Sequence, residues 1–129
     1  MVLISLSLPA QLPVFGQDFY NVKFIKNYDG DTFTFDLGSG LPDLFRTIPV
    51  RLYGIDTPEI KSKTQAAINA RDFAHSEIAS AKQVNLIGCS KDKYFRILCK
   101  IQYDGKDLTT ELLNKDMGYA YYGGKKRDY

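Results

Sequence analysis

Two carboxylates and an arginine gather around a proline-containing turn in the middle of the chain. Residues 50–55 form an apolar run typical of a strand, and the sequence Asp56-Thr57-Pro58-Glu59 follows it. Pro58 fixes its own φ and pushes Thr57 toward an extended conformation, so the two acids are held in a defined relation. This pattern is typical of an active site.

The arginine lies within the strand-like run that leads into this turn. Side chains alternate along a strand, which predicts Arg51, Tyr53 and Ile55 on one face and Leu52 and Gly54 on the other. We therefore expect the guanidinium group opposite the face of Leu52.

A second pair of acids lies upstream, between strand-like runs at 22–27 and 33–37. The sequence Asp29-Gly30-Asp31 separates these runs, and an Asp-Gly pair in this position is a strong hairpin signal. Asp and Gly are also what any tight turn requires. Taken alone, Asp31 is therefore either a turn residue or a member of the site.

Three separated motifs together resemble the staphylococcal nuclease family in order, identity and approximate spacing. They are residues 29–32, residues 50–59 and the later sequence Asp92-Lys93-Tyr94-Phe95-Arg96. The resemblance covers about residues 20–122 and implies the family's fold, a five-stranded barrel of the oligonucleotide-binding (OB) type. Phe95 departs from the pattern, because the staphylococcal enzyme has glycine there.

The resemblance implies a calcium site. Asp31, Asp56 and the backbone carbonyl of Thr57 occupy the positions of the family's metal ligands, and Asp29 contributes through water. The donor chemistry agrees, since two carboxylates at one site repel unless a cation lies between them, and hard oxygen ligands favour calcium.

The resemblance also assigns three catalytic residues. Arg51 and Arg96 match the two arginines that contact phosphate, and a guanidinium fork meets two phosphate oxygens at once. For Arg51, a structural ion pair with a nearby acid is the alternative. Glu59 matches the glutamate that deprotonates the attacking water, with orientation of that water by hydrogen bonding as the alternative.

Further positions match the family's substrate contacts. Lys93 and Tyr94 correspond to residues near the terminal phosphate of a bound nucleotide, and Tyr122 is expected to stack on a base. Packing against the protein is an equally good interpretation of the tyrosine near the end of the chain.

The implied activity is calcium-dependent hydrolysis of phosphodiester bonds in DNA and RNA, with water attack on phosphorus and departure of the 5′ oxygen. We expect single-stranded or unstructured substrates and a monomeric enzyme. The alternative is a catalytically silent OB-fold module that binds nucleic acid without cutting it.

Length and composition fit this interpretation. A chain of 129 residues supports one domain, and a net charge of +2 requires that any nucleic-acid affinity come from locally placed Arg and Lys. We expect an apolar N-terminal segment at 1–19, a nuclease-like domain at 20–122 and a short basic tail at 123–129. The tail is expected to be solvated, and the first segment to be either a signal remnant or an early strand.

The periodicity predicts a mainly β fold with helices, of the α+β class. Five strands with a helix inserted after the third fit a small, partly open barrel. Beyond the first two strand-like runs, the expected strands are 47–53, 84–87 and 95–103, and the expected helices are 65–81 and 108–115.

Other features bear on the environment of the protein. No apolar run approaches the roughly 20 residues that span a bilayer, so we expect no membrane segment, and the apolar start suggests a secreted or periplasmic protein. Cys89 and Cys99 flank the last strand pair and form either a cross-strand disulfide or two buried thiols. His75 is expected to be a solvated helix residue.

Overall fold

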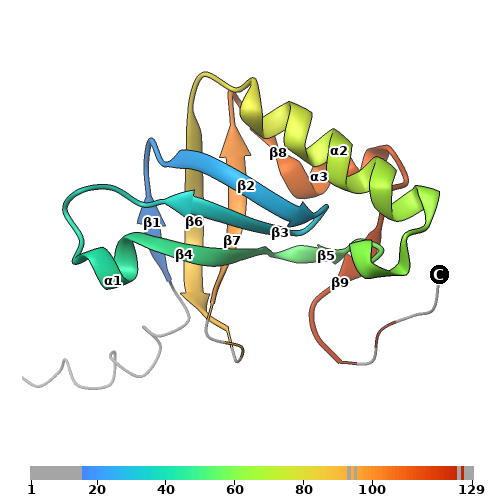
Figure 1. The fold of residues 1–129 in the computed structure, drawn as a ribbon, viewed down its shortest axis with the longest axis horizontal. Helices are drawn as coiled ribbons and strands as arrows, with labels where there is room; N and C mark the ends of the chain where they lie inside the picture. Colours follow the sequence, from blue (N-terminus) through green and yellow to red (C-terminus); the bar gives the residue numbers. More distant parts are fainter. Residues whose placement is uncertain (1–15, 93, 95, 125, 127–129) are drawn as a thin grey trace, which may run out of the picture.

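A mixed β-sheet forms the framework of the protein (Figure 1). The computed structural model describes residues 16–92, 94, 96–124 and 126. Its strands are, along the chain, β1 (Gln17–Phe19), β2 (Lys23–Asp29), β3 (Thr32–Asp36), β4 (Thr47–Leu52), β6 (Val84–Lys91), β7 (Ile97–Tyr103) and β8 (Lys106–Asp107). Their order in the sheet is β1-β6-β7-β4-β3-β2, and β8 pairs with β7. Neighbours in this sheet are antiparallel except for β4 and β7, which run parallel.

Helices and a second small sheet complete the fold. The short strands β5 (Gly54–Asp56) and β9 (Tyr119–Tyr121) pair with each other, and the helices are α1 (Asp43–Arg46), the 3-10 helix η2 (Ile60–Ser62), α2 (Gln65–Ala79) and α3 (Leu108–Asn114). In Figure 1, α2 and α3 lie beside each other, while α1 and the β5–β9 pair lie at opposite ends. In the part of the chain that the structure describes, no helix is long and apolar enough to cross a membrane.

Helix α2 follows from its sequence. The Thr64 side chain accepts a hydrogen bond from the Ala67 N–H at 3.2 Å and so caps the first turn. The buried face presents small residues and one larger anchor, namely Ala67, Ala70, Ala74 and Ile78. Small side chains let the helix axis approach the strands closely. The predicted helix is confirmed, and it ends at Ala79, two residues before the predicted end.

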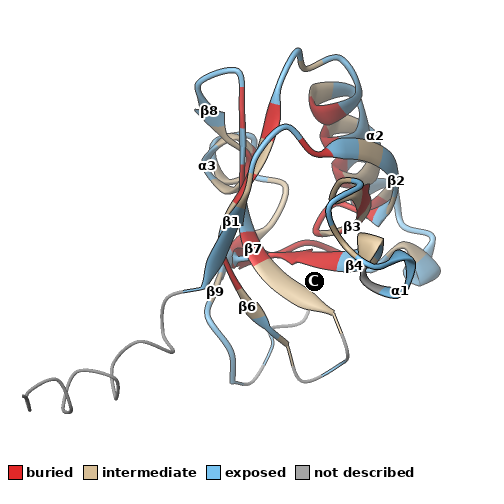
Figure 2. Ribbon diagram, turned by 90° about the vertical axis from the view of Figure 1, so that its left-hand side faces the viewer, coloured by how far each residue is buried: buried red, intermediate tan, exposed pale blue. Residues whose placement is uncertain are grey.

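The core lies between the sheet and the helices. Phe33 and Phe35 alternate inward from β3, and Val50 and Leu52 do the same from β4. Figure 2 shows buried stretches along α2 and β4 that face each other across this core. The α+β class predicted from the sequence is confirmed, with short strands added to the five that periodicity identified.

The predicted alternation from Arg51 to Ile55 is wrong, because the strand does not continue through Tyr53. Strand β4 ends at Leu52, and Gly54 has a φ of 91°, a left-handed conformation that few other residues adopt. Arg51 and Leu52, the last two residues of β4, are both buried, whereas Tyr53 is exposed. The chain then starts β5, which pairs with β9 instead of extending the larger sheet.

The predicted N-terminal segment 1–19 is described only in part. Strand β1 pairs antiparallel with β6, so residues 17–19 belong to the sheet. Residues 1–15, which hold the apolar segment, lie outside the described residues, as do 125 and 127–129 of the basic tail.

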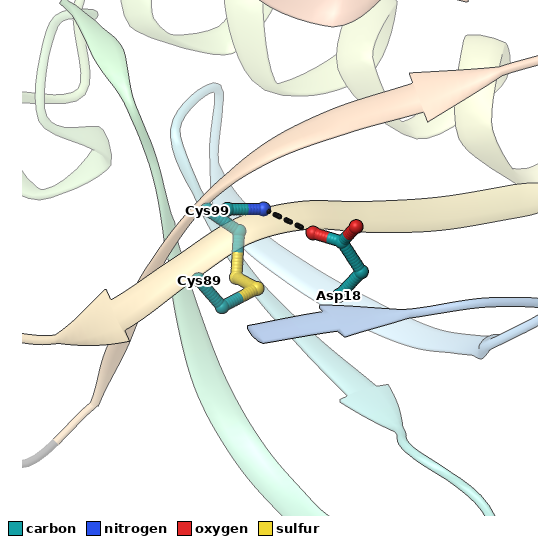
Figure 3. The surroundings of a disulfide bond; sticks show 4 residues. Asp18, Cys89 and Cys99 are labelled. Atoms are coloured by element: carbon teal, nitrogen blue, oxygen red, sulfur yellow. Dashed lines mark hydrogen bonds between the residues drawn. A yellow bond between two sulfur atoms is a disulfide. The ribbon is translucent and has the colours of Figure 1, made fainter. Parts of the chain in front are cut away.

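A disulfide joins Cys89 of β6 to Cys99 of β7 (Figure 3). It forms where the register between the two strands shifts, and the open alternative of two thiols is thereby excluded. The Gly88 N–H beside it donates to Asp18 Oδ1 at 2.7 Å, which fastens β1 to the same place. The bond joins the two strands of the hairpin that carries Asp92 and Arg96 between them.

Reduction of this disulfide should destabilise the protein by about 2–3 kcal/mol, because the bond removes loop-closure entropy from the unfolded chain. The expected result is a lower urea midpoint in the presence of a non-thiol reductant, with alkylation of Cys89 and Cys99 only after reduction. Alkylation of the untreated, unfolded protein would contradict the bond.

Candidate active site

The upstream hairpin and the proline-containing turn meet in the folded protein. The Thr57 N–H donates to Asp31 Oδ2 at 2.9 Å, and the Leu52 N–H donates to the Asp31 carbonyl at 2.8 Å. Gly30 permits this approach, since a Cβ there would lie 2.9 Å from the Thr57 side chain. Two motifs that are well separated in the sequence therefore form one buried cluster.

Arg51 lies at the centre of this cluster. Its Nη1 donates to the carbonyl oxygens of Leu52 and Ile55, each at 2.9 Å. The same nitrogen lies 3.2 Å from Asp31 Oδ2, and Nη2 lies 3.2 Å from Asp56 Oδ1. All three charged side chains are buried. The structural ion pair considered as the alternative role of Arg51 is therefore present, and it joins both predicted metal-ligand carboxylates.

Asp29 adds a third buried acid to the cluster. The Asp31 N–H donates to Asp29 Oδ1 at 3.3 Å, and both side chains are almost fully buried. Burial, reinforced by the negative charge of Asp31, raises the pKa of Asp29 from 3.8 to about 7. The raised pKa thus favours the protonated form of the Asp29 carboxyl below about pH 7.

The donor chemistry of the cluster fits a hard divalent cation. Asp31 and Asp56 supply carboxylate oxygens, and the buried Thr57 Oγ1 has no hydrogen-bond partner. Among the described residues, no three acidic, histidine or cysteine side chains converge on one point. A cation here would therefore be held by the two carboxylates and completed by backbone, hydroxyl or water oxygens, as calcium accepts.

A cleft of about 390 Å³ opens beside Arg51. Its charged and aromatic lining includes Arg51, Tyr53, Tyr94, Arg96, Tyr122 and Lys126. Arg96 forms an ion pair with Asp92 across the base of its loop, and its guanidinium carbon lies 5.4 Å from the Tyr94 ring centre. The structure therefore brings Arg51 and Arg96, the two predicted phosphate-contacting arginines, to one cleft.

Two of the exposed tyrosines in this cleft form a pair. The ring centres of Tyr53 and Tyr122 are 5.5 Å apart, and both side chains reach solvent. Sequence reasoning assigned a role to Tyr122 alone, because the expected alternation placed Tyr53 on a strand face. Lys93 lies outside the described residues, so its predicted role stays a prediction.

Glu59 sits on the chain that leaves the turn and enters η2. Its side chain is 58% exposed, and Oε2 lies 3.8 Å from Lys61 Nζ. Its carbonyl accepts hydrogen bonds from the N–H and hydroxyl of Ser62, which hold the backbone in place. The carboxylate thus faces solvent, three residues after Asp56 in the sequence, and it is not part of the lining of the cleft beside Arg51.

One site residue was missed by sequence reasoning. The ammonium of Lys126 lies 3.0 Å from Asp56 Oδ1, although the basic tail was predicted to be solvated. Lys126 is exposed, as a solvated tail predicts, but its ammonium also pairs with a buried carboxylate, and a run of Lys and Arg carries no signal of that contact. His75, by contrast, is exposed on α2 as predicted, where Nδ1 contacts Asn27 Oδ1 at 3.0 Å.

Comparison with known proteins agrees with this geometry. Residues 49–128 match the model of a family described as Staphylococcal nuclease homologue. The chain belongs to the staphylococcal nuclease family. An uncharacterized endonuclease of Haemophilus influenzae is 32% identical over 99 residues, covering 77% of this chain and 51% of that protein. A probable endonuclease of Schizosaccharomyces pombe is 32% identical over 88 residues, covering 60% of this chain and 38% of that protein.

This staphylococcal nuclease family member thus spans about half, or less, of the curated relatives that it matches. The matched family region includes Arg51, Asp56, Glu59 and Arg96, whereas Asp31 precedes it. The place of Asp31 in the site therefore rests on its hydrogen bond to Thr57.

Asp29→Asn should change how stability depends on pH in the presence of chelator. Because the folded-state pKa of about 7 exceeds the ordinary 3.8, the native wild type binds more protons and loses stability as pH rises between these values. The loss is at most about 1.4 kcal/mol per pH unit. Urea unfolding of both proteins from pH 4 to 7 should give a flatter profile for the variant, and parallel profiles would contradict the assignment.

Proposed function

We propose that this protein hydrolyses phosphodiester bonds in DNA and RNA. The observation that carries this proposal is the convergence of Arg51 and Arg96 on one cleft, beside the buried carboxylates of Asp31 and Asp56. Two guanidinium groups suit the equatorial oxygens of a phosphodiester, and the carboxylates suit a cation next to them. The endonuclease names of the two relatives point the same way.

We propose calcium as the cation, held by Asp31, Asp56 and an oxygen of Thr57. When bound, calcium supplies positive charge beside the phosphate and a place to orient water. The unpartnered Thr57 Oγ1 and the excess of buried carboxylates support this assignment.

The residues of the chain have separate roles in the proposed reaction. Arg51 and Arg96 hold the phosphate and neutralise the charge that its oxygens gather in the transition state. Glu59 accepts the proton of the water whose oxygen attacks phosphorus, and the bond to the 5′ oxygen breaks. Its exposed carboxylate suits contact with water, and the hydrogen bonds from Ser62 to the Glu59 carbonyl hold the backbone from which the carboxylate extends.

The surroundings of the site support further expectations about substrate and setting. Tyr94, Tyr122 and Tyr53 expose ring faces at the cleft, which suit unpaired bases and therefore single-stranded or unstructured nucleic acid. We also propose that the protein is a monomer. A secreted or periplasmic location is proposed because structural disulfides persist in oxidising compartments.

Cleavage of labelled single-stranded DNA and RNA should require calcium and stop with chelator, with magnesium as a comparison.

Glu59→Gln should slow cutting by about a hundredfold or more, because the amide cannot accept the proton. Glu59→Asp, compared across pH, distinguishes proton transfer from orientation of water. Tight binding without cutting in any metal would instead identify a silent binding module.

Arg96→Lys should lower turnover at least tenfold, or about 1.4 kcal/mol of transition-state stabilisation, since an ammonium cannot replace the two-point contact of a guanidinium. Single-turnover cleavage measures this effect. Because Arg96 is only partly buried, circular dichroism should show an unchanged fold, and near-normal turnover would remove Arg96 from the mechanism.

A further inference from the structure

The ammonium of Lys126 reaches a carboxylate that is otherwise shut away from solvent. The Lys126 side chain is 49% exposed, whereas that of Asp56 is only 6% exposed, and the two lie 3.0 Å apart. The oxygen concerned, Asp56 Oδ1, also lies 3.2 Å from Arg51 Nη2. A surface lysine thus inserts its charge into the cluster proposed to hold the cation.

Several contacts direct the lysine to this place. Strand β9 pairs antiparallel with β5, so the chain passes Asp56 at Tyr119 and leaves the strand at Tyr121, opposite Gly54. The Tyr121 hydroxyl donates to the Gly124 carbonyl at 2.8 Å. The Lys126 ammonium lies 5.7 Å from the Tyr121 ring centre. Among the described residues, Tyr121 thus contacts both Gly124 and the lysine that reaches Asp56.

The position of the ammonium conflicts with a divalent cation on the same carboxylate. A cation bound to Asp56 and an ammonium 3.0 Å from Oδ1 of the same side chain would stand close together and repel strongly, because the surroundings are buried. Arg51 is held by two carbonyl groups and cannot leave easily, whereas Lys126 is half exposed and on a flexible stem. Lysine is the partner that a cation would displace.

We propose that Lys126 is a built-in competitor of the cation at Asp56, so that the ion pair and cation binding exclude each other. The inference rests on the cation site of the proposed function. The two equilibria are linked, so each lowers the other by the same factor. The ion pair lowers the affinity of Asp56 for the cation, and a bound cation lowers the stability of the ion pair. The displaced ammonium stays at the cleft that Arg51 and Arg96 line, where it adds positive charge for a phosphate.

Calcium titration calorimetry on the full chain at low salt tests the competition without measuring activity. Lys126→Met should bind calcium about fivefold more tightly than the wild type, and Lys126→Arg should bind close to the wild-type affinity. Lys106→Met is the matched control, because that lysine pairs with Glu77 at 3.7 Å and does not line the cleft. Its affinity should be unchanged.

Asp56→Asn separates this inference from the proposed function. Calcium binding that is lost in this variant locates the cation at Asp56, and an increase in Lys126→Met then supports the competition. Equal or weaker binding in Lys126→Met overturns the inference while the cation site stands. Absence of binding in the wild type and in Lys126→Met overturns the cation site and the inference together.

Discussion

The structure of this site depends on the buried guanidinium group of Arg51. It joins the carbonyl groups of Leu52, at the end of β4, and Ile55, within β5, to the carboxylates of Asp31 and Asp56. A buried charge is tolerated only when its partners stay in place, and removal of one partner typically costs 3–5 kcal/mol. The hairpin, the strand break and the proline-containing turn are therefore tied to one another through a single side chain.

The same arrangement explains why the cluster suits a cation. The buried carboxylates of Asp31 and Asp56 contact the buried Arg51, and Asp29 lies beside Asp31, where burial and the charge of Asp31 raise the pKa of Asp29. A fold selected for stability alone would place apolar groups here, since well-packed hydrophobic replacements of buried ion pairs are often neutral or stabilising. The surplus acid is thus better explained by chemistry than by stability, and Lys126 partly offsets it.

Rigid and adjustable parts of the site come from different places. Arg51, Asp31 and Asp56 sit on paired strands or on a hairpin fastened to them, with little exposed surface. Arg96 lies between strands β6 and β7, at the tip of their hairpin. The disulfide joins these two strands at Cys89 and Cys99, farther from the tip than Arg96. Glu59 and Lys126 are the most exposed charged members, which suits a water-activating group and a displaceable counter-ion.

Local patterns in the sequence determined the α+β class, the main strands, helix α2 and the residue types at the site, because periodicity, turn residues and motif identity act within a few neighbours. The strand break at Gly54, the pairing of Cys89 with Cys99 and the path of the tail to Lys126 were decided only by tertiary structure. Each depends on which distant segments come within bonding distance. The double role of Arg51 is of the same kind, since its buried partners come from two motifs that only the folded sheet brings together.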